Sequence, residues 1–590
     1  MTNKSNDHLK TFDVTWKLSD LYSAETDIAM KEDMQYCEKK AAELKTMYDG
    51  KLADLSATEL LKLVSELEKL EVLQGKISTY AFLNFATRTK DAKAAALLQE
   101  IREFISGISR DTVFFELELN QLDNDIAEKL LQSETLAHYQ HYLISLRRYA
   151  PHQLSRTEET ILLEKAPVGR SSWNNLFDKV LGHLKFGEQQ RSEEEVLTDL
   201  YAGDRNIRRQ AAKDLTEGLN SQLHILTHIF NTILADKMID DRLRTYPSWV
   251  SSMNLYNELE GSTVDTLIEE VTSRYDVVQR YYNLKCRLLD IPKLVDYDRY
   301  APLPNLPEES ISWPKCKSMV LDSFDAFSPE IAGIAAKFFD QQWIHAPVIE
   351  GKRGGAFAHP CVPEVHPYVM VNYSGTLRDV STVAHELGHG VHQHLAAKLG
   401  YYNSDTTLVL AETASVFAEL LLFKAQVDII RDKEQQRAFI CQKIESIFAT
   451  VFRQVAMNRF EDLVHNSRRD KGELSSDDFT AHWLASQRQM FGESVVLTED
   501  YGVWWSYIPH FLSTPGYVYS YAFGELLVLS LYNLYKKDPD GFVPLYLELL
   551  GHGGSVTPYD LLKPFGIDLN DPSFWRGGMK IIDDMLGDIE

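Results

Sequence analysis

The segment spanning residues 382–392 contains the pattern His-Glu-x-x-His, formed by His385, Glu386 and His389. Residues four apart lie one turn apart on the same face of a helix, so two imidazoles at this spacing can bind one metal ion. The glutamate beside the first histidine then lies near the open coordination position, where it can take a proton from a metal-bound water. The pattern predicts a zinc site for hydrolysis. A helix that carries two histidines by chance is the alternative.

The residues around this pattern favour a helix. Thr376 and Asp379 have the spacing of a capping box, which predicts where the helix begins. Gly388 is a poor helix residue, by about 1 kcal/mol relative to alanine, and its presence fits a close approach of another backbone or of a ligand. His392 follows His389 by three residues, but three ligands from so short a run would strain a tetrahedral site. We therefore interpret His392 as a packing residue or as a support for a ligand.

A catalytic zinc site needs a third protein ligand besides its open position. Glu412 lies among apolar residues of a second predicted helix, for which Asp405 is the expected N-cap. A carboxylate on such a surface is unfavourable unless it is paired or binds a metal, so we predict that Glu412 is the third ligand. Glu419 lies seven residues further on the same face and could hold a ligand histidine through its other ring nitrogen. The alternative places both glutamates on a solvated face.

Composition narrows the class of protein. Lys and Arg number 61 and Asp and Glu number 86, a net charge of −25, which makes nucleic acid and anionic membrane surfaces poor partners. The acidity either keeps the chain in solution or forms a negative cleft for cationic peptides. The five cysteines are scattered and form no C-x-x-C pair, which argues against a disulfide framework and against a cysteine zinc site. No secretory signal or membrane span is recognisable, so we expect a cytoplasmic protein.

The expected fold class is mainly α. Apolar residues recur at three- and four-residue steps through most of the first 290 residues, for example over residues 56–80. Prolines over residues 291–314 predict a long connection, and a helix is expected from about residue 313 to 339. Residues 368–373 predict a strand, with residues 355–357 as its candidate partner.

The block from His385 to Glu419 resembles the M3 family of metallopeptidases, which pairs H-E-x-G-H with a later E-x-x-S, here Glu412 to Ser415. Further segments resemble the oligoendopeptidase F branch of this family, related to thimet oligopeptidase. The likeness spans nearly the whole chain in order, at residues 15–22, 352–357, 372–375 and 510–521. It implies a helical ellipsoid with a deep substrate channel and a small β-sheet beside the H-E-x-x-H helix. We expect an N-terminal helical domain at about residues 1–195 and an M3-like catalytic domain at about 196–590.

The resemblance also assigns roles to individual residues. It implies that one zinc ion per chain is bound by His385, His389 and Glu412, and that Glu386 is the general base.

The resemblance further implies that a histidine and tyrosines near the C-terminus hydrogen-bond the substrate carbonyl and its oxyanion. His510 matches the histidine. Tyr517 and then Tyr521 are favoured as the tyrosine, because they would share a face if the stretch is helical, while Tyr519 stays open. Core packing is the alternative for each tyrosine.

The predicted function is a zinc-dependent endopeptidase that hydrolyses internal bonds of short oligopeptides. The strand at residues 368–373 is expected to hold the peptide as an added strand. One alternative is an exopeptidase resembling dipeptidyl carboxypeptidase, and another is a peptide-binding protein without catalysis. Two histidines and one glutamate leave an open metal position beside a base, whereas structural zinc sites are closed by four ligands, which disfavours the second alternative. Oligomeric state and cleavage preference stay open.

Overall fold

The computed structural model describes residues 2–304 and 310–590, and the chain is mainly helical, as predicted. Contacts divide it into two compact units, each built from segments far apart in the sequence. The first unit comprises the described residues of Met1–Ala150, Glu308–Ile429 and Leu534–Ile567. The second comprises those of Pro151–Pro307, Ile430–Asn533 and Asp568–Glu590. These units are defined by contacts and do not test the domain boundary near residue 195, which stays a prediction. The substrate channel also stays a prediction.

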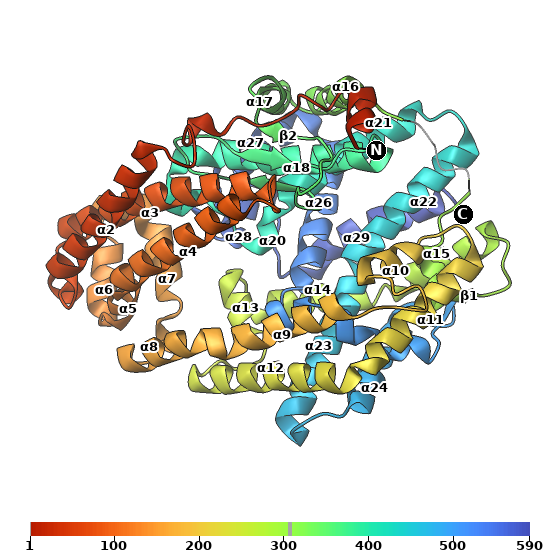
Figure 1. The fold of residues 1–590 in the computed structure, drawn as a ribbon, viewed down its shortest axis with the longest axis horizontal. Coiled ribbons are helices and arrows are strands. Elements are labelled where there is room, and N and C mark those ends of the chain that lie inside the picture. The colour runs from red at the N-terminus through yellow and green to blue at the C-terminus, as the bar shows by residue number, and fades with distance from the viewer. Residues whose placement is uncertain (1, 305–309) are drawn as a thin grey trace. The chain divides into compact units, whose positions relative to one another are not determined.

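Long amphipathic helices form most of the first unit. Ser56 and Glu59 form a capping box at the start of α3, which gives partners to backbone N–H groups at the helix end. Helices α2, α3 and α4 lie side by side (Figure 1). The helices of this unit are α1 (Thr2–Leu9), α2 (Ile28–Tyr48), α3 (Ala57–Ala86), α4 (Ala92–Thr112), α5 (Phe114–Gln121), α6 (Asn124–Leu131), α7 (Gln140–Arg147), α16 (Trp313–Asp325), α17 (Pro329–Asp340), α18 (Leu377–Ala396), α19 (Tyr401–Ser404), α20 (Leu408–Ala411), α21 (Thr413–Ile429), α27 (Pro539–Gly551) and α28 (Pro558–Leu562).

A three-stranded sheet lies beside α18, the helix that carries the H-E-x-x-H pattern, as predicted. Its order is β2 (Ile344–His345), β4 (Tyr368–Met370), β3 (Phe357–His359), with β2 parallel and β3 antiparallel to β4. The strand expected at residues 368–373 is therefore present over residues 368–370 only, and it pairs with residues 357–359, which overlap the expected partner 355–357 at Phe357. All three residues of β4 are buried, so this strand anchors α18 and β3 to the core of the unit.

The single helix expected from residue 313 to 339 is wrong, because the chain forms two helices, α16 and α17. Pro329 is the first residue of α17, where it has no N–H to donate and disfavours helical geometry in the residue before it. The Ser328 hydroxyl accepts the N–H of Ile331 and starts the second helix. The helical periodicity continued across this break and concealed it.

The second unit contains a large aromatic core with Trp483, Trp504 and Trp505 fully buried. The long connection at residues 291–314 contains β1 (Leu294–Val295), which pairs in parallel with β5 (Val495–Val496), and the 3₁₀ helix η6 (Asp296–Tyr300). Pro307 of this connection lies outside the described residues. The helices of this unit are α8 (Arg156–Lys165), α9 (Arg170–His183), α10 (Glu193–Asp199), α11 (Arg205–Ser221), α12 (Leu223–Leu243), α13 (Ser251–Tyr256), α14 (Gly261–Thr272), α15 (Tyr275–Leu288), α22 (Lys433–Thr450), α23 (Phe452–Lys471), α24 (Ser476–Phe491), η8 (Asp500–Tyr507), α25 (His510–Ser513) and α29 (Pro572–Gly587).

Helix α26 (Tyr519–Lys537) runs from the second unit into the first, since the division falls between Asn533 and Leu534. Within residues 2–304 and 310–590, no helix has both the length and the apolar character that crossing a membrane requires.

Candidate metal centre

Helix α18 begins at the predicted capping box. The Thr376 hydroxyl accepts the N–H of Asp379 at 3.1 Å, and the Asp379 carboxylate accepts the N–H of Thr376 at 2.9 Å. Val380, Val383 and Leu387 are fully buried on one side of the helix. This fixed start and buried face set the rotation of α18, and with it the direction of the histidines one turn apart.

Gly388 allows α18 and α21 to cross at very short range. A Cβ atom at this position would lie only 2.6 Å from the carbonyl oxygen of Ala414 and 2.6 Å from Cα of Ser415. The close backbone approach predicted for this glycine is therefore present. Because α21 starts directly after Glu412, the crossing brings that residue to the histidines of α18.

Glu412 lies at the junction between α20 and α21. Asp405 is not the N-cap expected for this region, because it ends α19, and α20 follows Thr407 without a side-chain cap. The Ser415 hydroxyl donates to Oε2 of Glu412 at 2.7 Å and contacts its backbone oxygen at 3.1 Å. The serine of the E-x-x-S pattern thus orients the carboxylate.

The three predicted ligands converge. Oε2 of Glu412 lies 3.4 Å from Nε2 of His385 and 3.4 Å from Nε2 of His389. One donor atom from each residue lies within 4.8 Å of the others. Two ligand atoms at 2.0–2.1 Å from a tetrahedral metal lie about 3.4 Å apart, so the measured separations fit a metal ion of this kind. Two imidazoles and one carboxylate are also a donor set suited to zinc.

Glu419 supports the first histidine, as its spacing predicted. Its Oε1 lies 2.6 Å from Nδ1 of His385, which leaves Nε2 directed toward Glu412. Burial lowers the pKa of His385, but the hydrogen bond and charge of Glu419 outweigh it and raise that pKa to about 9. Burial raises the pKa of Glu412, but His389 and His385 lower it to about 2. The carboxylates around the imidazoles therefore stay ionised, which favours a cation at this position.

Glu386 lies beside this cluster and is buried, with 6% of its surface exposed. Burial raises the pKa of its carboxyl group, and the charges of His385 and His389 oppose that effect. The backbone N–H of Ala358, in β3, also acts to lower this pKa. The sequence contained the strand but gave no signal of this contact, because strand periodicity does not tell which residue of an edge faces a neighbouring helix.

His392 is buried and stands outside the cluster. Burial lowers its pKa to about 4, so its imidazole is neutral over most of the pH range. Among the residues that the structure describes, the side chains placed closely enough to hold a metal ion are those of His385, His389 and Glu412. The interpretation of His392 as a packing or supporting residue agrees with its place outside this group.

His510, Tyr517 and Tyr521 come together within the second unit. Nε2 of His510 lies 3.3 Å from the Tyr521 hydroxyl, and the rings of Tyr517 and Tyr521 are 4.7 Å apart. The His510 and Tyr517 rings are nearly parallel, with centroids 6.2 Å apart. Helix α26 starts at Tyr519, so the helical spacing assumed for these tyrosines is wrong, and their contact arises where the chain enters the helix.

Tyr519 differs from its two neighbours. Its side chain is fully buried, and its hydroxyl accepts a hydrogen bond from Nδ2 of Asn257 at 2.9 Å. Tyr517 and Tyr521 are half-buried. Tyr519 is therefore the packing residue of the three, which reduces the choice left by the sequence to Tyr517 and Tyr521.

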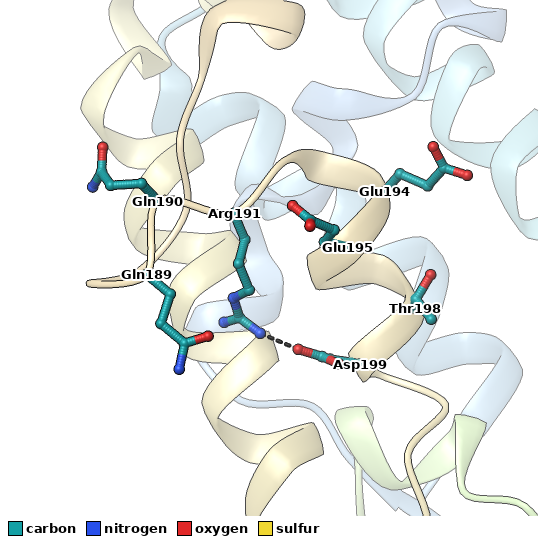
Figure 2. A pocket seen from close by; sticks show the side chains of 7 residues that line it. All are labelled: Gln189, Gln190, Arg191, Glu194, Glu195, Thr198 and Asp199. Atoms are coloured by element: carbon teal, nitrogen blue, oxygen red, sulfur yellow. Dashed lines mark hydrogen bonds and ion pairs between the residues drawn. The ribbon is translucent and has the colours of Figure 1, made fainter. Parts of the chain in front are cut away.

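A separate pocket lies on the second unit, lined by residues of α10 and of the segment that precedes this helix. It has a volume of about 660 Å³, and Arg191 forms an ion pair with Asp199 at its wall (Figure 2). None of the predicted site residues lines it. The lining residues are Gln189, Gln190, Arg191, Glu194, Glu195, Thr198 and Asp199.

Comparison with known proteins decides the family. The model of peptidase family M3 matches residues 198–581, and a model described as oligopeptidase F matches residues 118–186. The chain belongs to peptidase family M3. This assignment confirms the resemblance and the prediction of a metalloendopeptidase.

Full-length relatives and structures agree with membership of family M3. Oligopeptidase PepF of Bacillus subtilis is 25% identical over 98% of this chain and 87% of its own length. Oligoendopeptidase F from Enterococcus faecium has a TM-score of 0.71 at 22% identity, covering 95% of this chain and 97% of that one. PZ peptidase A with an inhibitor has a TM-score of 0.75 at 14% identity, covering 97% and 100%. These two structural likenesses confirm the mainly helical fold.

Proposed function

We propose that this family M3 chain is a zinc-dependent endopeptidase that hydrolyses internal bonds of short oligopeptides. The supporting observation is the convergence of His385, His389 and Glu412 at separations suited to a tetrahedral metal, with Glu386 beside them. The names of its relatives, oligopeptidase PepF and oligoendopeptidase F, agree with peptides as the substrate class.

The zinc ligands in this proposal are the two histidines of α18 and Glu412, with one ion per chain. When bound, zinc supplies a Lewis acid that polarises the substrate carbonyl and makes a water easier to deprotonate. Glu419 holds His385 in the tautomer that leaves Nε2 free, and Ser415 holds the carboxylate of Glu412.

Glu386 is the proposed general base. It accepts a proton from the attacking water and then delivers it to the leaving amine. Burial raises its pKa, which suits a group that must both take and return a proton near neutral pH.

His510 and one of its tyrosine neighbours are the proposed donors to the substrate carbonyl oxygen. Their mutual contacts and partial exposure support this role, because a donor to a ligand needs both a fixed direction and an open side. Tyr521 is within hydrogen-bond distance of His510, whereas Tyr517 makes a ring contact with it.

The peptide-binding strand expected at residues 368–373 is wrong, because β4 lies in the middle of its sheet and both of its edges are paired. Strand β3 is at the edge and carries Ala358, whose N–H reaches Glu386. We therefore propose that the free edge of β3 takes the peptide as an added strand, which would place its backbone beside the general base.

An internally quenched peptide blocked at both ends tests this function. Internal cleavage that a chelator abolishes and added zinc restores is the expected result. Cleavage only of peptides with a free terminus would instead indicate an exopeptidase. Zinc binding without any cleavage would indicate a peptide-binding protein.

A further inference from the structure

The segment that leads into β3 is held in place through its backbone. The Lys352 ammonium donates to three backbone oxygens, at 3.2, 2.8 and 2.6 Å, which belong to His345, Pro347 and Val371. The N–H of Arg353 donates to the backbone oxygen of Ala86, in α3, at 2.7 Å. Nδ2 of Asn372 donates to the backbone oxygens of Arg353 at 2.9 Å and of Gly355 at 2.8 Å. These bonds fix the backbone from which the Arg353 side chain projects.

The Arg353 guanidinium lies over the ring of Phe82, in α3. Its Cζ is 5.6 Å from the centroid of that ring, and the arginine is exposed. The Phe82 ring also contacts Phe357 and His359 of β3, with centroids 5.3 and 5.5 Å away, and all three rings are half-buried. Burial lowers the pKa of His359 to about 4, so this imidazole adds no charge near neutral pH. A platform of neutral rings, two of them on the edge strand, thus carries one guanidinium.

Arg353 lacks the anionic partner that the cations near it have. Arg88, which follows the end of α3, forms an ion pair with Glu25 at 2.7 Å. Lys90 forms an ion pair with Glu350 at 2.6 Å. Among the residues that the structure describes, none makes a hydrogen bond or an ion pair with the guanidinium of Arg353. A guanidinium binds a carboxylate with two parallel hydrogen bonds, so a carboxylate is the ligand that this side chain fits best.

The register of the sheet shows how the free edge of β3 is directed. Ala358 pairs with Val369, whose N–H donates at 2.9 Å to the backbone oxygen of Trp343, on the far side of β4. In such an antiparallel pair the partner directs its N–H and C=O away from the shared strand, so those of Ala358 point to the free edge. Phe357 and His359 face α3, and the Ala358 side chain therefore faces the opposite side. A peptide added at this edge would place every second side chain on the α3 side.

We propose that Arg353, over the ring of Phe82, binds the carboxylate of a Glu or Asp side chain of the peptide substrate. That side chain belongs to a residue that faces α3 when the peptide lies along the free edge of β3. The net charge of −25 otherwise disfavours acidic peptides, so an unpaired cation beside this edge gives a preference for an acidic residue at one position. The residues that form this site all belong to the first unit. This inference rests on the proposed peptidase function.

Internally quenched peptides blocked at both ends, with Glu or Gln at each position around the cleaved bond in turn, test this site in the full-length zinc enzyme. We expect Glu to be preferred at one position, by about 2- to 10-fold in kcat/KM and mainly through KM, which is the effect of one exposed charge-assisted pair. In Arg353→Met that ratio should fall to about one. Arg353→Lys should keep part of the preference, because it keeps the charge without the planar fork. Lys90→Met, the matched control, removes an exposed cation that is already paired with Glu350 and should keep the whole preference.

Equal kcat/KM for Glu and Gln at every position in the wild-type enzyme would overturn the assignment. A preference for Glu that Arg353→Met retains, or that Lys90→Met removes to the same extent, would overturn it as well. A further pair of peptides, with a free acid or an amide at the C-terminus, separates the two sources of a carboxylate. A preference for the acid that Arg353→Met removes, without any preference for Glu, would assign the guanidinium to the terminal carboxylate instead. In each of these cases cleavage of the blocked peptides leaves the proposed function intact, whereas an enzyme that cleaves none of them contradicts both.

Discussion

The two polar clusters of this protein differ in how completely their groups are partnered. In the first unit, Glu419 and Ser415 hold His385 and Glu412, two of the three proposed metal ligands, so these donors are directed before any ligand arrives. In the second unit, Nε2 of His510 lies 3.3 Å from the Tyr521 hydroxyl and its ring is nearly parallel to that of Tyr517, and both tyrosines are only half-buried. A metal site needs rigid donors, whereas groups that receive a peptide must exchange their partners with it. Variants of these residues test this contrast.

Glu386→Gln should have the largest effect on activity. The amide keeps the shape of the side chain but cannot accept the proton, so we expect kcat to fall by about 10³-fold or more. Zinc content, measured by mass spectrometry, should stay at one per chain because no ligand is lost. Substantial remaining turnover would remove Glu386 from the role of base.

Tyr521→Phe should lower kcat by about 10²-fold with little change in zinc content, since it removes one donor to the carbonyl oxygen. Tyr519→Phe is the matched control, because that hydroxyl is buried against Asn257. The control should keep its turnover and lose about 1 kcal/mol of stability, measured by urea unfolding. Equal kinetics in the two variants would assign the donor role to Tyr517 instead.

Glu419→Gln should weaken zinc binding by about 10- to 100-fold, because it removes the charge that holds His385. The dissociation constant can be measured by competition with a chromophoric chelator. Glu188→Gln, at an exposed carboxylate of the second unit, should leave the constant unchanged. An unchanged constant in Glu419→Gln would show that the ring keeps its direction without this partner.

Gly388→Ala should destabilise the first unit by about 1–3 kcal/mol, because the new methyl group meets the backbone of α21. It should also reduce zinc occupancy, since the crossing of α18 and α21 delivers Glu412. Gly333→Ala is the control, because that glycine of α17 has open space around it, and it should gain up to about 1 kcal/mol. Equal unfolding midpoints would contradict the close crossing.

Glu461 should give the stability of the folded chain a slope with pH. Burial raises its pKa to about 8, although the N–H of Gly516 donates to it at 2.8 Å and opposes that effect. The folded chain therefore holds this proton after the unfolded chain has lost it. Stability from this group is complete below about pH 4.5 and declines until about pH 8, by at most about 1.4 kcal/mol per pH unit. Urea unfolding of Glu461→Gln between pH 6 and 8 should show a flatter slope than the wild type, and identical slopes would contradict it.

The sequence predicted the metal cluster well because its geometry is local. The four-residue step of the histidines, the capping box and the seven residues from Glu412 to Glu419 are all helical spacings. Gly388 signalled a close approach because glycine has no other advantage inside a helix. The place of Glu412 between two helices instead of within one escaped this reasoning, and so did the role of Asp405 as the end of α19.

The group of His510, Tyr517 and Tyr521 could be predicted only in part, because its contacts arise where a non-helical segment enters α26. No periodicity tells that His510 contacts Tyr521, and the resemblance alone pointed to these residues. The central position of β4 in its sheet could not be predicted either, since the sequence of a three-residue strand does not differ between the edge and the centre of a sheet. Contacts of high sequence separation are the part of a fold that local patterns do not encode.

Helix α27 packs against α18, and the Tyr546 hydroxyl of α27 reaches the backbone oxygen of Thr413, directly after the glutamate ligand. During synthesis, the ribosome adds about 130 residues between Thr413 and this support. A nascent chain therefore carries the three proposed metal ligands long before the helix that supports Thr413 exists. The proposed metal centre would then gain this support only late in translation, after α27 has been made.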